Sequence, residues 1–155
     1  MVFSIALRLL RDRAIAEELA QDVFLQLHEK LPGLGSAEHI RFWLRRVTVH
    51  RAIDEARRRK LRPKTSLEEI REPSATDRER DPFMDRMLRS LVGALPERAR
   101  AIVIMRYQED LEPAEIARLL DMPASSVKSL LHRSLRLLRG KVERAGFAPR
   151  SEISA

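Results

Sequence analysis

The stretch PAEIARLLDMPASSVKSLLHR, residues 113–133, decides how the C-terminal part of this chain folds. It is typical of two helices, over 113–120 and 124–140, that are separated by a turn at Asp121. A helix-turn-helix needs small and apolar side chains at fixed offsets where its two helices cross. The spacing places such residues on the inner side: Ile116, Ala117, Leu120, Met122, Val127, Leu130 and Leu131. We therefore predict a helix-turn-helix.

The outer face of the second helix combines short hydroxyls with long cations, namely Ser125, Ser126, Lys128, Ser129, His132, Arg133 and Arg136. Short side chains near a helix N-terminus allow close approach to a DNA groove, and cations reach phosphates or guanine edges. We expect these residues to contact duplex DNA. An ordinary helical hairpin with a solvated basic face would carry the same residues.

Two longer helices are predicted upstream. Over residues 3–31, apolar side chains recur every four positions from Ile15 to Leu31, with Ala16, Ala20 and Phe24 beside them. A turn at 11–13 divides this segment, and the glycines and proline of 32–36 end it. The next helix spans 37–59, and its Trp43 is more typical of a core residue than of a base-stacking one. Its second half is strongly basic, with nine cations and two acids between Arg45 and Lys64.

Residues 61–82 interrupt the helical pattern with three prolines and turn acidic. Such a composition shift marks a domain boundary, and the segment is too polar to bury a core. Beyond it, Met84 to Leu95 form an apolar stripe, and Pro96 opens the next helix at a first-turn position. We predict an all-α fold of two small domains, 1–60 and 83–145, with a flexible linker over 61–82 and a tail over 146–155. Each domain would have its own core, near the lower size limit for independent folding.

Composition favours a polyanionic partner, although a basic protein without a nucleic-acid role would share it. The net charge is +7 and the sequence pI is about 10.7. The chain has no cysteine, which excludes disulfides and zinc–thiolate sites. No apolar run approaches the roughly 20 residues that span a bilayer, and no signal-peptide pattern is present. We expect a cytoplasmic protein that does not insert into a membrane.

No catalytic motif is apparent. The four histidines, His28, His39, His50 and His132, are far apart in the sequence and lack metal-ligand spacing. Neither a glycine-rich phosphate loop nor a nucleophile elbow occurs. We predict a binding protein without a cofactor or metal, whose catalysis belongs to a partner.

Three segments, in order, resemble the extracytoplasmic function (ECF) sigma factors, the smallest members of the sigma-70 family of bacterial RNA polymerase sigma factors. The resemblance covers roughly residues 3–145. Residues 16–25, AEELAQDVFL, look like region 2.2 of that family, and residues 42–59, FWLRRVTVHRAIDEARRR, look like regions 2.3 and 2.4. Residues 95–133 look like region 4. Three motifs in this order around a polar linker are more specific than any one of them.

The resemblance implies a transcription initiation factor that is not itself an enzyme. Its first domain would bind the clamp helices of core RNA polymerase through Glu18, Gln21 and Asp22, a polar face that could otherwise be the solvent side of a helix. The same domain would open the −10 element of promoter DNA, held by Arg45, Arg46, His50, Arg51, Arg57 and Arg58. The loop 32–39 corresponds to the pocket for a flipped −10 base.

The second domain would read the −35 element with its helix-turn-helix and touch the polymerase flap. Most relatives are held inactive by an anti-sigma factor, so such a factor is an expected partner.

Several positions depart from the family pattern. His50 stands where the family usually has asparagine, which puts promoter choice in doubt but not the role of the helix. Glu112-Pro113 replaces a Ser or Thr cap, so we expect a weaker helix cap. Asp121 replaces the usual turn glycine, and aspartate tolerates left-handed backbone better than most residues. Relatives also carry further residues before the segment that begins at Val2, so either Met1 is a late start or the first helix is shortened.

Two other functions are open on the residues alone. A stand-alone helix-turn-helix repressor would dimerise and bind palindromic duplexes, but that hypothesis leaves the basic helix unexplained. A sigma mimic would bind an anti-sigma factor and neither polymerase nor DNA. That hypothesis predicts the loss of base-reading cations, yet Lys128, Arg133 and the run 57–60 are present.

Overall fold

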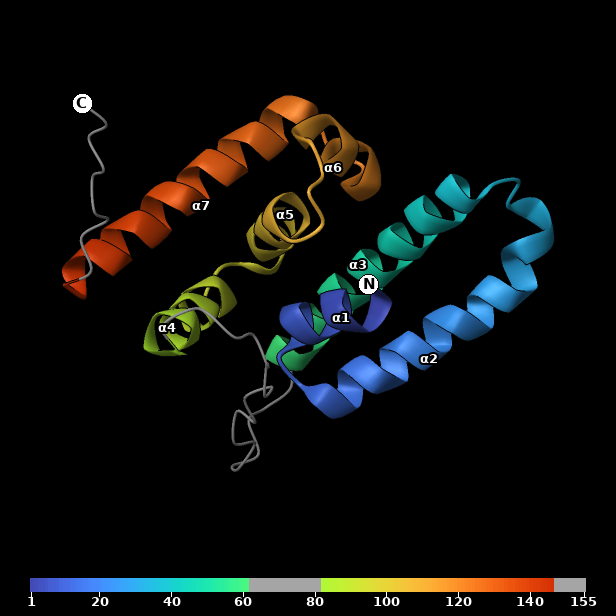
Figure 1. The fold of residues 1–155 in the computed structure, drawn as a ribbon, viewed down its shortest axis with the longest axis horizontal. Coiled ribbons are helices and arrows are strands. Elements are labelled where there is room, and N and C mark those ends of the chain that lie inside the picture. The colour runs from blue at the N-terminus through green and yellow to red at the C-terminus, as the bar shows by residue number, and fades with distance from the viewer. Residues whose placement is uncertain (62–81, 147–155) are drawn as a thin grey trace.

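The computed structural model describes residues 1–61 and 82–146, and within these ranges the chain is helical without any strand (Figure 1). The all-α prediction is confirmed. The N-terminal unit comprises α1 (Val2–Leu10), α2 (Arg13–Lys30), the short 3-10 helix η1 (Leu31–Gly33) and α3 (Ala37–Leu61). The C-terminal unit comprises α4 (Pro82–Gly93), α5 (Glu97–Tyr107), α6 (Pro113–Leu120) and α7 (Ala124–Arg144). Of the predicted linker, 61–82, Leu61 belongs to α3 and Pro82 to α4. Its residues 62–81, like residues 147–155 of the predicted tail, lie outside the described residues.

The N-terminal unit is a three-helix arrangement in which α2 and α3 form a hairpin through η1 and α1 packs against both (Figure 1). The predicted turn at 11–13 is confirmed, because Arg11 takes left-handed backbone with φ 58° and ends α1. Asp12 then caps α2, since its side chain accepts a hydrogen bond of 3.1 Å from the backbone N–H of Ile15. Arg11 and Asp12 therefore form a tight turn that joins α1 to α2.

The predicted helix-turn-helix is formed by α6 and α7. Ile116 and Val127, from its two helices, are fully buried, and Ala117 is almost so. Asp121 ends α6 in left-handed backbone with φ 53°, as expected for an aspartate in place of glycine. The backbone N–H of Met122 donates to the carbonyl oxygen of Ala117 at 2.9 Å, which closes the turn.

Two local predictions about helix starts are wrong. Pro96 is the cap residue before α5 rather than its first helical residue. The start of α6 is also better capped than expected, because the backbone N–H of Glu112 donates to the carboxylate of Glu115 at 2.8 Å within a capping box. The sequence pattern did not predict this contact from Glu115.

The prediction of two separate cores is also wrong. One contiguous cluster of buried apolar residues runs from the N-terminal unit, through residues such as Leu9 and Ile53, into the C-terminal unit at Ile102 and Met105. The reason is that α5 packs against α1 and α3, and α6 packs against α3. A second, smaller cluster lies within the C-terminal unit, around Leu138. The two units are thus packed on each other.

The apolar stripe predicted for the first long helix is correct only in part. Ala16, Leu19 and Val23 are buried, but Phe24 is 52% exposed and Leu31 is 49% exposed. Trp43 is half-buried against the main cluster, consistent with a core position.

Candidate nucleic-acid interface

The residues predicted for the −35 element share one side of α7. Ser125, Lys128, Ser129, His132, Arg133 and Arg136 are exposed, and Ser126 is half-buried. The opposite side of the helix is anchored by Val127, Ser134 and Leu138, which are buried. Three cations and a histidine therefore lie on a surface whose orientation is set by the packing beneath it.

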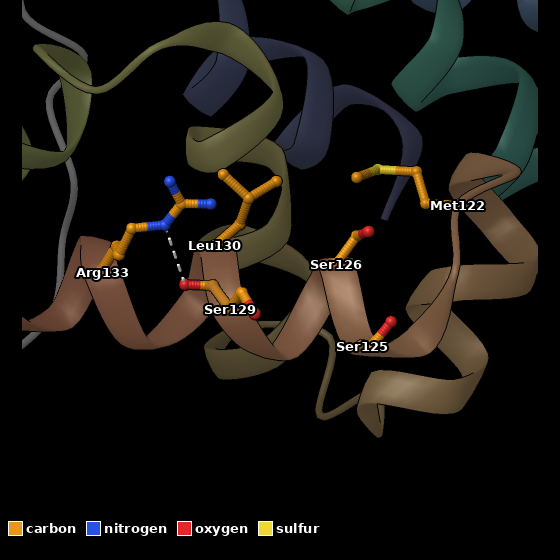
Figure 2. A pocket seen from close by; sticks show the side chains of 6 residues that line it. All are labelled: Met122, Ser125, Ser126, Ser129, Leu130 and Arg133. Atoms are coloured by element: carbon orange, nitrogen blue, oxygen red, sulfur yellow. Dashed lines mark hydrogen bonds between the residues drawn. The ribbon is translucent and has the colours of Figure 1, made fainter.

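This surface is hollowed where the turn meets α7 (Figure 2). Met122 and Leu130 supply apolar walls, and three serines with Arg133 supply polar ones: the lining residues are Met122, Ser125, Ser126, Ser129, Leu130 and Arg133. The Nε of Arg133 donates to the carbonyl oxygen of Ser129 at 3.4 Å. An open pocket with apolar walls and a cation at its edge suits the methyl edge of a base beside a phosphate.

The start of α7 adds backbone donors to this face. Pro123 precedes the helix and gives no side-chain cap. The first N–H groups of a helix have no partner inside it, and with the helix dipole they favour an anion. Because Ser125 and Ser126 belong to this first turn, their backbone N–H groups lie beside the pocket.

The cations predicted for the −10 element fall into two groups along α3. Arg45, Arg46 and His50 contact the C-terminal unit. The Nε of Arg45 lies 3.0 Å from Oε2 of Glu109, Arg46 forms a two-pronged pair with Asp121 at 3.0 and 2.6 Å, and the Nε2 of His50 lies 2.9 Å from the carbonyl oxygen of Leu119. These side chains are engaged by the protein itself in this arrangement.

Within the described residues, the remaining cations of that set form no hydrogen bond or ion pair with the C-terminal unit. Arg57 is exposed, and Arg58 is exposed while pairing with Glu55 on its own helix at 3.2 Å. Arg51 pairs at 3.1 Å with Asp22 of α2. The C-terminal end of α3 therefore presents exposed cations while the middle of the helix is in contact with the C-terminal unit.

The residues predicted to bind polymerase, Glu18, Gln21 and Asp22, are all exposed on α2. The sequence pattern missed two apolar neighbours, because Phe24 and Leu25 are 52% and 67% exposed on the same helix. Polar residues beside exposed large apolar ones are typical of a protein-binding surface. The loop 32–39, which we predicted to hold a −10 base, is mostly exposed, and the side chain of Ser36 accepts a hydrogen bond from the backbone N–H of His39 at 3.1 Å.

A buried arginine holds the two units together, and no sequence signal pointed to it. Arg100 of α5 is only 9% exposed. Its guanidinium donates to the carbonyl oxygens of Leu9 at 2.6 Å, Gly93 at 2.5 Å and Leu95 at 3.1 Å. Burial lowers the pKa of Arg100, yet arginine is basic enough to stay charged. One cation thus satisfies carbonyls at the ends of α1 and α4.

Lys60, at the end of α3, forms a second ionic contact between the units with Glu97 of α5. The hydrogen bond from Lys60 holds the pKa of Glu97 below its usual range. A carboxylate that is charged more readily in the folded chain stabilises the packed arrangement at neutral pH.

Within residues 1–61 and 82–146, no cluster of His, Asp or Glu is placed to hold a metal ion. No helix in these ranges is long and apolar enough to cross a membrane.

Comparison with protein families matches both units. The model for sigma-70 region 2 matches residues 1–62, and the model for sigma-70 region 4 matches residues 85–138. The chain is 32% identical over 146 residues to the ECF RNA polymerase sigma factor SigL of Mycobacterium tuberculosis, covering 91% of this chain and 82% of that one. It is 30% identical over 136 residues to the RNA polymerase sigma-E factor of Streptomyces coelicolor, covering 86% and 75%.

A solved structure shares the fold. The sigma factor RpoE of Bartonella quintana, determined in complex with the anti-sigma factor NepR, matches with a TM-score of 0.73 at 14% identity. The match covers 92% of this chain and 89% of that one. Helices of both units therefore have counterparts in that fold.

Proposed function

The chain belongs to the ECF sigma factors of the sigma-70 family, which direct RNA polymerase to promoters, and we propose that its two units divide promoter recognition between them. Residues 83–145 read the −35 element as a duplex. Residues 1–60 hold the opened −10 element and bind core polymerase.

The −35 contact is assigned to the exposed side of α7. Lys128, Arg133 and Arg136 reach phosphates and guanine edges, while the serines of the first turn let the helix approach the groove. The pocket walls at Met122 and Leu130 suit a thymine methyl group. His132 extends the same face.

The −10 contact is assigned to α3. Arg57 and Arg58 are exposed in the packed arrangement, and Arg45, Arg46 and His50 become accessible when the two units separate. Holding single-stranded DNA requires cations along the backbone and surfaces for unstacked bases. The exposed loop 32–39 at the start of α3 is the proposed site for one such base.

The polymerase contact is assigned to α2. Gln21 and Asp22 supply hydrogen-bonding groups, and Phe24 and Leu25 supply apolar area on the same exposed surface. Apolar residues with a polar rim are the composition of a protein interface core. Because Arg51 pairs with Asp22, this surface is joined directly to the DNA-binding helix.

The observation that carries the proposal is the exposed cationic side of α7 above a buried helix-turn-helix core. To test it, a duplex selected from a random pool by the wild-type chain is titrated at several salt concentrations. Lys128→Ala and Arg133→Ala should each weaken binding and lower the salt slope by about 1. The matched control is Arg144→Ala at the far end of α7, which should change little. Equal losses in all three variants would contradict the assignment.

The α3 assignment has its own test. Arg57→Ala combined with Arg58→Ala should weaken binding of a random single-stranded oligonucleotide and leave the selected duplex unaffected. The salt slope should fall by roughly 0.7 for each lost phosphate contact. Unchanged single-strand affinity would remove α3 from the −10 role.

Two partners complete the proposal. Because RpoE of Bartonella quintana is bound to the anti-sigma factor NepR, we propose an anti-sigma factor as an inhibitor of this chain. The proposed site of action is the cytoplasm, where bacterial polymerase and promoter DNA are located. A repressor would bind duplex DNA without needing core polymerase, and a sigma mimic would bind neither.

A further inference from the structure

We propose that the C-terminal unit inhibits the −10 contacts of its own chain, with Glu109 and Asp121 as carboxylate substitutes for DNA phosphate on the cations of α3. This inference rests on the proposed assignment of α3 to the −10 element. We call the contacts of Arg45, Arg46 and His50 with the C-terminal unit the latch.

The pair between Arg46 and Asp121 has the geometry with which arginine binds phosphate. Nη1 donates to Oδ1 at 3.0 Å and Nη2 donates to Oδ2 at 2.6 Å, so the guanidinium is engaged as a fork. Nη1 also donates to the carbonyl oxygen of Arg118 at 3.1 Å. A phosphate of the promoter would need the same edge of Arg46, so the two acceptors compete for it.

Glu109 and the end of α6 engage the neighbouring residues of α3. The Arg45 and Glu109 side chains are only 24% and 12% exposed, so solvent screens their pair less than a surface pair. His50 completes the latch, with its Nε2 donating to the carbonyl oxygen of Leu119 at 2.9 Å and lying 3.8 Å from Asp121. Consecutive turns of α3 are thereby covered by one unit.

Two residues of the latch, His50 and Asp121, are distant in the sequence. The structure brings the Nε2 of His50 to 3.8 Å from the carboxylate of Asp121, although the two residues are 71 positions apart. Left-handed backbone favours glycine, whereas aspartate only tolerates it. The backbone conformation at residue 121 therefore does not explain why an aspartate stands there. Its carboxylate forms the ion pair with Arg46.

The latch is selective. The −35 side of α7 and the cations Arg57 and Arg58 stay exposed while Arg45, Arg46 and His50 are engaged. The packed chain can thus bind a −35 duplex but lacks part of its −10 surface. If most molecules are packed, the apparent single-strand affinity is reduced by the open fraction. Weakening the latch raises that fraction and the affinity by the same factor.

The test uses the full chain with Asp121→Asn, which removes the charge but keeps a side chain that accepts left-handed backbone. The matched control is Asp110→Asn, because Asp110 is also exposed and left-handed, with φ 51°, and pairs with no cation within the described residues. The control also corrects for the general gain in DNA affinity when one negative charge is lost. Circular dichroism verifies that all variants are folded.

Separation of the units is measured directly by spin labels. Because the chain contains no cysteine, Glu29→Cys on α2 and Arg139→Cys on α7, both at exposed positions, provide unique labelling sites. Electron–electron double resonance then gives the distance distribution between the units. We expect a narrow distribution for the unmodified latch and for Asp110→Asn, and a broader, longer one for Asp121→Asn.

The DNA readout is the affinity for a random single-stranded oligonucleotide. Relative to Asp110→Asn, we expect Asp121→Asn to bind about threefold tighter, and Glu109→Gln with Asp121→Asn to bind about tenfold tighter. An unchanged distance distribution in the double variant would overturn the latch, as would separated units that bind no tighter than the control. Failure of the proposed −10 role itself would appear separately, as unchanged affinity in the Arg57 and Arg58 variant, because neither residue belongs to the latch.

Discussion

Replacing Arg100 by methionine tests how the two units are joined. Arg100→Met keeps a long side chain of similar reach but removes the donors to Leu9, Gly93 and Leu95. Hydrogen bonds to a charged group contribute about 1.5–3 kcal/mol each, and a buried carbonyl left without a donor costs about 1–3 kcal/mol. Desolvation of the guanidinium, which also lowers the pKa of Arg100, offsets part of this contribution. We expect a net loss of about 3 kcal/mol in the free energy of unfolding.

The measurement is urea denaturation followed by far-ultraviolet circular dichroism. A loss of that size should lower the melting temperature by about 6–12 °C in a chain of this length. Arg98→Met is the matched control, because Arg98 is exposed on the same helix, and it should stay within about 0.5 kcal/mol of the wild type. Equal stability of the two variants would refute the role assigned to Arg100.

Three further predictions concern other parts of the molecule. Asp22→Ala should weaken binding to core polymerase in a pull-down and leave duplex affinity unchanged; unchanged polymerase binding would exclude this side of α2. Ile116→Ala should cost about 2–5 kcal/mol in urea denaturation because it opens a cavity beneath the helix-turn-helix, and a smaller loss would mean that the site collapses. Because the pKa of Glu97 is lowered, its stabilisation is complete above the unfolded pKa of about 4.3 and disappears as the pH falls through the lower folded value. The stability difference between wild type and Glu97→Gln should therefore shrink in that acid range, and a difference independent of pH would contradict the Lys60 contact.

The helix-turn-helix could be predicted from the sequence because its constraints are local. Ile116, Ala117 and Val127 lie within one short stretch, and their offsets are fixed by the crossing of two helices. The turn at Asp121 could be predicted for the same reason, because it depends only on residues next to it in the chain. Sequence patterns are most reliable where a residue's neighbours in space are also its neighbours in the chain.

The stripe of apolar residues predicted from Ile15 to Leu31 does not predict burial along its whole length. A spacing of four residues advances about 40° beyond a full helical turn, so a stripe drifts around the helix. From Ile15 to Leu31 the drift reaches about 160°, which places Leu31 on the opposite side. Leu31 is also the C-cap residue that directly follows α2. Its exposure is therefore a geometric consequence of the spacing itself.

The packing of the two units was beyond the reach of sequence patterns. Arg45 and Glu109 are 64 positions apart, and Arg100 and Leu9 are 91 apart. A run of arginines indicates an anionic partner, but a carboxylate of the same chain satisfies a guanidinium as a phosphate does. In this structure Arg45 and Arg46 of α3 are engaged by Glu109, which precedes α6, and by Asp121, which directly follows it, while their contact with DNA stays a prediction.

The central claim, that this chain directs polymerase to promoters, is tested by transcription of genomic DNA from its own bacterium. Purified core polymerase is incubated with the chain and sheared DNA, and the 5′ ends of the RNA are sequenced. We predict discrete start sites that share −35 and −10 motifs and that disappear when Lys128→Ala and Arg133→Ala are combined. Start sites no different from those of core polymerase alone would contradict the account.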